Sequence, residues 1–113
     1  MVQKNNNDKK VNMAERILSL IDGDSKVVLA DKLLSKSVVS ILKDNELMDT
    51  IDAFFQNNLN ISETSRNAFM HRNTLLYRIE KIYKVTGLNL RNLNDAVEFM
   101  FLKSIYNNTK NVR

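Results

Sequence analysis

The chain of 113 residues has the length of one compact domain and an ordinary globular composition, with 43% apolar and 27% charged residues. It has no Cys and one His, which excludes a disulfide framework and thiolate or histidine-rich metal sites, and no apolar run approaches the ~20 residues of a membrane span. Because the start, MVQKNNNDKK, also lacks the apolar region of a signal peptide, we expect a cytoplasmic protein. The absence of Pro and the presence of only two Gly favour an all-α fold and exclude glycine-rich phosphate loops.

The first twenty residues are predicted to contain a tail followed by a short helix. Residues 1–10 are rich in Asn and Lys without apolar periodicity, so they are expected to form a flexible tail or linker, and residues 11–113 a single helical domain. Apolar residues then recur at helical spacing up to residue 21. Asn12 and Glu15, three positions apart, are the expected capping pair of this helix.

Two further helices are predicted before residue 60. Ser25 is the expected N-cap of a helix over 27–43, although a Ser-Lys-Ser run at 35–37 interrupts the pattern. Asp44 is the expected N-cap of the next helix, which ends near Asn57. Each segment carries an apolar stripe on one face, as helices of a small bundle do.

A helix, a turn and a second helix are predicted next. Ser62 is the expected N-cap of a helix over 63–69, and a turn at 70–71 separates it from a helix over 72–86. Gly87 stands where a left-handed residue closes a helix. The apolar stripe of the second helix is predicted to consist of Leu75, Ile79, Ile82 and Tyr83.

The last predicted helix opens at Asn92 and runs to about Asn107. Its interior, residues 93–106, is apolar on nearly every side, and a helix of that kind is buried all round. One core of this size cannot cover every side of a terminal helix, so the pattern predicts that a second copy of the chain covers the rest. The expected fold is therefore an all-α small helical bundle that forms a homodimer.

The positive charge is concentrated in one segment. Residues 61–91 hold six basic and two acidic residues, a net charge of +4, which equals the net charge of the whole chain. A basic segment of this kind is typical of a nucleic-acid-binding surface, although a solvated helix face has the same composition.

Residues 62–86 meet the requirements of a helix-turn-helix, in which two short helices flank a tight turn and the second enters the major groove of DNA. The small residues Ser65 and Ala68 allow the two helices to approach closely. Long polar side chains on the second helix avoid its apolar stripe. The apolar residues expected to hold the two helices together are Ile61, Met70, Leu75 and Ile79.

Residues 71–79, with the sequence HRNTLLYRI, resemble the C-terminal helix-turn-helix domain of PucR/CdaR-type bacterial transcription regulators, which include the sugar-diacid regulators. The preceding helix (46–51, ELMDTI), the entry to the motif (60–62, NIS) and its exit (86–91, TGLNLR) resemble the same domain. The resemblance covers roughly residues 45–106. It departs from the family at Ser65, Ala68, Asn89 and Leu93, of which the first two predict slightly looser packing between the motif helices.

The motif is also similar to the DNA-binding end of Fis and of NtrC-type activators. This similarity implies that Arg72 reads a base and that Thr74 contacts a phosphate. An Arg fork can bind guanine O6 and N7, and Asn73 is suited either to adenine or to capping the helix. Further contacts, mainly to phosphate, are expected from the remaining polar side chains. The predicted DNA-binding set is Ser62, Arg66, His71, Arg72, Asn73, Thr74, Tyr77, Arg78 and Lys81.

The predicted function is sequence-specific binding to double-stranded DNA by a bacterial transcription regulator, with helix 72–86 in the major groove. No catalytic constellation, metal-ligand spacing or cofactor motif is present, so no enzymatic activity, metal or cofactor is expected. A sensory domain upstream of the chain is a further expectation. Two alternatives remain open: a helical protein-interaction module whose basic face is merely solvated, and a Fis-like nucleoid protein indifferent to sequence.

Overall fold

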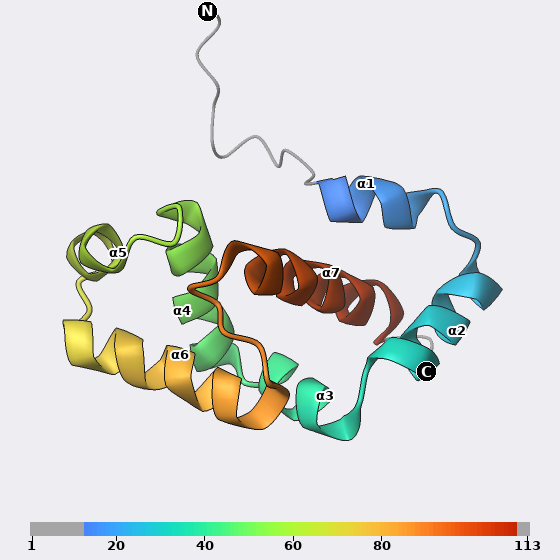
Figure 1. Ribbon diagram of the computed structural model, residues 1–113. Helices are drawn as coiled ribbons and strands as arrows, with labels where there is room; N and C mark the ends of the chain where they lie inside the picture. Colours follow the sequence, from blue (N-terminus) through green and yellow to red (C-terminus); the bar gives the residue numbers. More distant parts are fainter. Residues whose placement is uncertain (1–12, 111–113) are drawn as a thin grey trace, which may run out of the picture.

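The computed structural model describes residues 13–110, which form seven α-helices and no strand (Figure 1). The all-α prediction is therefore confirmed for this part of the chain, whereas the expected tail and the Asn12 cap lie outside the described residues. None of the described helices is long and apolar enough to cross a membrane. The helices are α1 (Met13–Ser19), α2 (Gly23–Leu33), α3 (Lys36–Leu42), α4 (Asn45–Gln56), α5 (Ile61–Asn67), α6 (Arg72–Thr86) and α7 (Leu93–Thr109).

The N-cap of α2 is Asp22, so the prediction of Ser25 was wrong. The Asp22 carboxylate accepts a hydrogen bond from the backbone N–H of Ser25 at 2.8 Å, which places Ser25 within the first turn. This bond lowers the pKa of the Asp22 carboxyl below its ordinary value. The cap is therefore present near neutral pH and is lost as the pH falls through the lowered pKa.

The single helix predicted over 27–43 is in fact two helices. Leu34 has an extended backbone, and the Ser35 hydroxyl accepts a hydrogen bond from the N–H of Val38 at 3.1 Å, so a new helix begins there. A serine hydroxyl that binds the backbone in this way competes with helix continuation. The Ser-Lys-Ser run thus ends α2 and starts α3.

The start of the helix-turn-helix also differs from the prediction. Asn60, and not Ser62, caps α5, because its side-chain oxygen accepts the N–H of Glu63 at 2.8 Å. The earlier start places Ile61 inside the helix, where it is buried. The caps at Asp44 and Asn92 are confirmed.

The helices form two groups that share one core (Figure 1). In the first group α6 packs against α4 and α5, and in the second α7 packs against α1 and α2. The short α3 contacts α4, α6 and α7, so it joins the groups. Phe54 of α4, Leu75 of α6 and Phe99 of α7 are fully buried in this core.

The chain itself covers much of α7, which corrects the reasoning behind the predicted dimer. Helices α1 and α2 lie along α7, and Phe99, Leu102 and Ile105 are buried. Only the first turns of α7 leave large apolar side chains in solvent, with Leu93 68% and Val97 41% exposed. The apolar character of this helix therefore does not by itself require a second chain.

The stripe of α6 is confirmed at Leu75, Ile79 and Ile82, but Tyr83 is 48% exposed and was wrongly assigned to it. Gly87 closes the helix with a φ of 80°, and its N–H donates to the Tyr83 carbonyl at 2.8 Å. This left-handed end fixes where the chain turns toward α7.

Gly87→Ala is expected to lower the free energy of unfolding by about 1 kcal/mol, because alanine is strained at this φ. No atom lies within 4 Å of the position that a Cβ would occupy, so backbone strain is the only cost. Gly23→Ala is the matched control: it has equal space and lies within a helix, so it should leave stability unchanged or raise it. Urea denaturation measures both, and equal effects would contradict the prediction.

Candidate nucleic-acid interface

Helices α5 and α6 and the turn between them form a helix-turn-helix. The N–H of Met70 donates to the Ser65 carbonyl at 2.9 Å, and the Ser65 hydroxyl donates back to the Met70 carbonyl. Of the four apolar residues predicted to hold the two helices together, Ile61, Leu75 and Ile79 are buried in the core, and Met70 is half-buried against it. The first helix ends at Asn67 and not at residue 69, because Phe69 adopts a positive φ.

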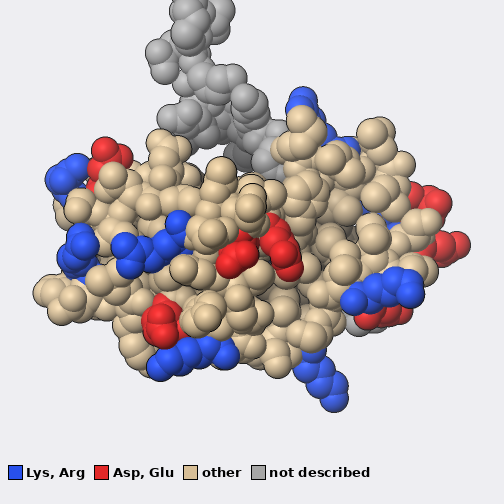
Figure 2. Space-filling model, viewed as in Figure 1, with Lys and Arg blue, Asp and Glu red and all other residues tan. Residues whose placement is uncertain are grey.

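Most of the predicted DNA-binding side chains are exposed on this motif. Lys and Arg side chains gather at the end of the molecule formed by α5 and α6 (Figure 2). Thr74 and Arg78 are half-buried. The exposed members of the set are Ser62, Arg66, His71, Arg72, Asn73, Tyr77 and Lys81.

His71 is the N-cap of α6. Its Nδ1 accepts the backbone N–H of Asn73 at 3.0 Å. In the neutral ring this bond requires the proton on Nε2, so the exposed His71 side chain carries an N–H donor beside the helix N-terminus. The cap also settles one alternative: the Asn73 side chain does not cap the helix and is exposed.

Arg72 and Ser62 lie together at the starts of the two motif helices. The Arg72 guanidinium donates to the Ser62 hydroxyl at 3.3 Å, and both residues are exposed. A long hydrogen bond in solvent holds a side chain weakly, so Arg72 is free to exchange this partner for a base or phosphate. The Arg72 side chain thus reaches from the start of α6 to the start of α5.

The outer face of α6 forms one wall of an open groove, and the start of α4 forms the other. Five of the nine predicted residues line this groove from the α6 side. Asp44, Glu46 and Leu47 line it from α4. The α6 residues are Asn73, Thr74, Tyr77, Arg78 and Lys81.

Arg78 has a structural role that sequence reasoning missed. Its guanidinium donates to the Thr50 hydroxyl at 2.7 Å and to the Glu46 carboxylate at 2.9 Å. Thr50 is 1% exposed, so Arg78 ties α6 to α4 through a buried group. The sequence signal was a polar Thr50 on the buried side of α4, four residues after Glu46. DNA contact by Arg78 stays a prediction.

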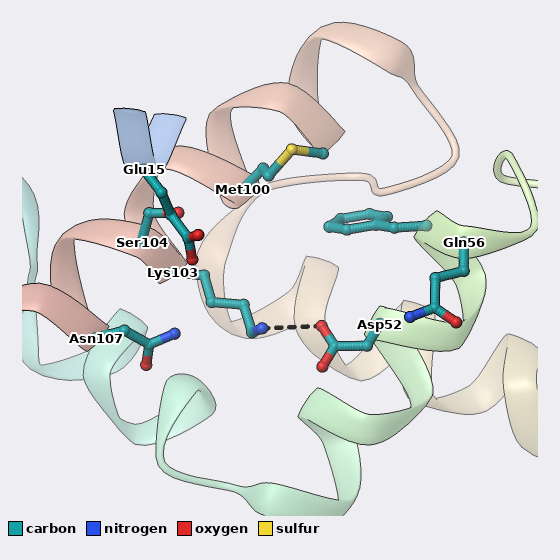
Figure 3. A pocket seen from close by; sticks show the side chains of 8 residues that line it. Glu15, Asp52, Gln56, Met100, Lys103, Ser104 and Asn107 are labelled. Carbon is teal, nitrogen blue, oxygen red and sulfur yellow. Dashed lines mark hydrogen bonds and ion pairs between the residues drawn. The ribbon is translucent and has the colours of Figure 1, made fainter. Parts of the chain in front are cut away.

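A second hollow lies between α4 and α7, with Glu15 of α1 at its edge (Figure 3). There the Lys103 ammonium binds the Asp52 carboxylate at 2.8 Å. None of the predicted DNA-binding residues lines this hollow. Residues 13–110 also contain no cluster of His, Cys, Asp and Glu able to hold a metal ion.

A basic helix-turn-helix with an exposed, capped second helix defines the DNA-binding class of small helical domains. Similarity to a known family gives a narrower classification than the fold does. Residues 47–102, about half of the chain, match the PucR C-terminal helix-turn-helix domain. This segment therefore belongs to the PucR family of regulator domains, as the motif at 71–79 predicted.

Curated relatives match just under half of the chain. The carbohydrate diacid regulator of Escherichia coli (strain K12) is 45% identical over 51 residues, covering 45% of this chain and 13% of that protein. The purine catabolism regulatory protein of Bacillus subtilis (strain 168) is 35% identical over 49 residues, covering 43% of this chain and 9% of that protein. These matches span a small part of much longer proteins. No solved structure matches the chain.

Proposed function

We propose that the chain binds double-stranded DNA in a sequence-specific manner, with α6 in the major groove, as part of a transcription regulator. The observation that carries the proposal is the start of α6, where the exposed residues His71, Arg72 and Asn73 follow one another at one helix N-terminus. The segment 64–79 around them holds no Asp or Glu. Membership of a regulator family supports the same conclusion.

The positions of the side chains suggest a division between base reading and anchoring. Arg72 and Asn73, in the first turn of α6, are proposed to reach base edges, where their side chains form bidentate contacts with guanine and adenine. Ser62, Arg66 and Lys81 are proposed to bind phosphates on either side. His71, Thr74 and Tyr77 are proposed to make further contacts with DNA at the edge of its major groove.

Lys81→Ala is expected to weaken binding to every duplex by a similar factor and to reduce the slope of log affinity against log salt by ~1. Lys81 is exposed about two turns beyond the start of α6 and lines the groove between α4 and α6. A cation at this distance from the proposed base readers is suited to bind a phosphate. Salt titrations on a selected and a random duplex measure the effect. Lys32→Ala, on the distant α2, is the charge-matched control and should leave the slope unchanged.

Selection of bound sites from a pool of random duplexes tests the proposed function. The expected result is one enriched sequence, and an unenriched pool after repeated rounds would contradict it. The symmetry of the enriched sequence reports the oligomeric state, because a dimer places its recognition helices on half-sites about 34 Å apart or a multiple of that.

We further propose that the regulator acts as a homodimer in the cytoplasm. Leu93 and Val97 are the exposed apolar residues of α7, and they line a shallow groove with Phe55, Leu59 and Met100. We infer that this apolar patch packs against the same patch of a second copy, as a twofold interface requires. The greater length of the relatives supports a separate sensory domain that controls DNA binding.

A further inference from the structure

A phenylalanine side chain stands almost entirely in solvent in the turn between α5 and α6. Phe69 is 96% exposed, the highest value among the large apolar side chains of residues 13–110. Its φ is 52°, in the left-handed region that bulky side chains avoid. Residues held in such conformations cluster at binding and switch sites, where the strained geometry is part of the function.

The outward position of Phe69 is imposed by the turn on both sides. Two hydrogen bonds join Ser65 to Met70, and the N–H of Phe69 itself donates to the Arg66 carbonyl at 3.4 Å. Ala68 and Met70 are half-buried, and Met70 packs against the core. The hydrogen-bonded turn therefore holds the ring in its exposed position.

The surroundings of the ring favour a polyanion with apolar groups on its surface. Arg66, His71 and Arg72 are exposed close to Phe69 in the sequence, and the nearest acidic residues lie outside segment 64–79. A purely apolar partner would leave these donors unpaired. DNA can pair with the basic side chains and also offer the ring an apolar contact. Its phosphates bind cations, and the thymine methyl is an apolar group on the floor of the major groove.

We propose that the Phe69 ring packs against the C5-methyl group of a thymine in the major groove, beside the bases that Arg72 reaches. The inference rests on the function proposed above. Phe69 precedes α6 by three residues, so its ring approaches DNA from the same end as the Arg72 side chain. Phe69 thereby adds one position to the recognised sequence and selects thymine there.

Phe69→Asn tests this proposal on the duplex that the wild-type chain selects from a random pool. Asparagine tolerates the left-handed conformation, so the variant removes the ring and keeps the turn, which a thermal melt confirms. Each thymine of the duplex is replaced in turn by uracil, which lacks only the methyl group. Leu20→Asn is the control for loss of an exposed apolar side chain, since Leu20 is 87% exposed beyond the end of α1.

The wild-type chain is expected to lose about 3- to 5-fold in affinity at one uracil position, the effect of one buried methyl group. Phe69→Asn is expected to bind the unmodified duplex about 10-fold more weakly and to bind thymine and uracil equally at that position. Leu20→Asn should behave as the wild type.

Discrimination between thymine and uracil that persists in Phe69→Asn would overturn the proposal. So would unchanged DNA affinity together with loss of self-association, which would assign the ring to a protein interface. If the wild-type chain enriches no sequence at all, the proposed function itself fails, before the variant is compared. The two failures are therefore distinguishable.

Discussion

Arg72→Ala is expected to lower affinity for the selected duplex by about 10- to 100-fold and affinity for a random duplex by only a few fold. A bidentate contact between Arg and guanine contributes ~1–3 kcal/mol of discrimination against the wrong base. In the free protein the guanidinium is exposed and has one 3.3 Å bond to Ser62, so its removal should leave the fold intact. Fluorescence anisotropy titrations of both duplexes measure the two affinities.

Arg16→Ala is the matched control for this prediction, because it removes one exposed positive charge on α1, away from the motif. It should change both affinities slightly and by the same factor. Equal losses on the two duplexes in Arg72→Ala would make Arg72 a phosphate anchor and not a base reader. Repeating the selection with the variant adds a second readout, because a lost reader relaxes the preference at one base position.

Arg78→Ala is expected to lower the free energy of unfolding by about 2 kcal/mol. The guanidinium makes a charge-assisted bond of 2.7 Å to Thr50, which is buried, and bonds to charged groups contribute ~1.5–3 kcal/mol. The pair with Glu46 adds little, because the Glu46 side chain is 75% exposed and screened by solvent. Urea denaturation of the wild type and variant measures the difference.

Glu46→Gln separates the two partners of Arg78. It removes the exposed charge and keeps the buried Thr50 bond, so stability should fall by less than about 0.5 kcal/mol. A large loss in Glu46→Gln with a small one in Arg78→Ala would contradict the assignment of the buried bond as the main contribution. A stable Arg78→Ala variant with strongly weakened DNA binding would instead support the predicted contact of Arg78 with DNA.

The main helices were predictable because their signals are local. Helix α6 shows the i, i+4, i+7 stripe of Leu75, Ile79 and Ile82, and it ends at a glycine whose φ is positive. The errors at helix starts occurred where two capping residues compete within three positions. Ser62 and Asn60 both have the right side chain, and the burial of Ile61, a tertiary effect, decides between them.

The features that sequence reasoning missed depend on contacts between distant residues. Arg78 and Glu46 are 32 residues apart, and only the packing of α6 against α4 brings them together. Helices α1 and α2 pack against α7, but the apolar stripes of α1 and α2 do not indicate which helix they pack against. Seven of the nine predicted DNA-binding residues are exposed on the motif, but exposure alone does not show which of them touches DNA.

The central claim is that α6 reads a DNA sequence, and the most direct test compares affinity for the selected duplex with affinity for a scrambled duplex of the same composition. Both are titrated between about 50 and about 200 mM salt. We predict that the selected duplex binds at least ~10³-fold more tightly, with both affinities falling as salt rises. Equal affinity for the two duplexes would indicate a sequence-indifferent nucleoid protein, and an absence of salt-dependent binding to either would indicate a helical interaction module. Either result would contradict the proposed function.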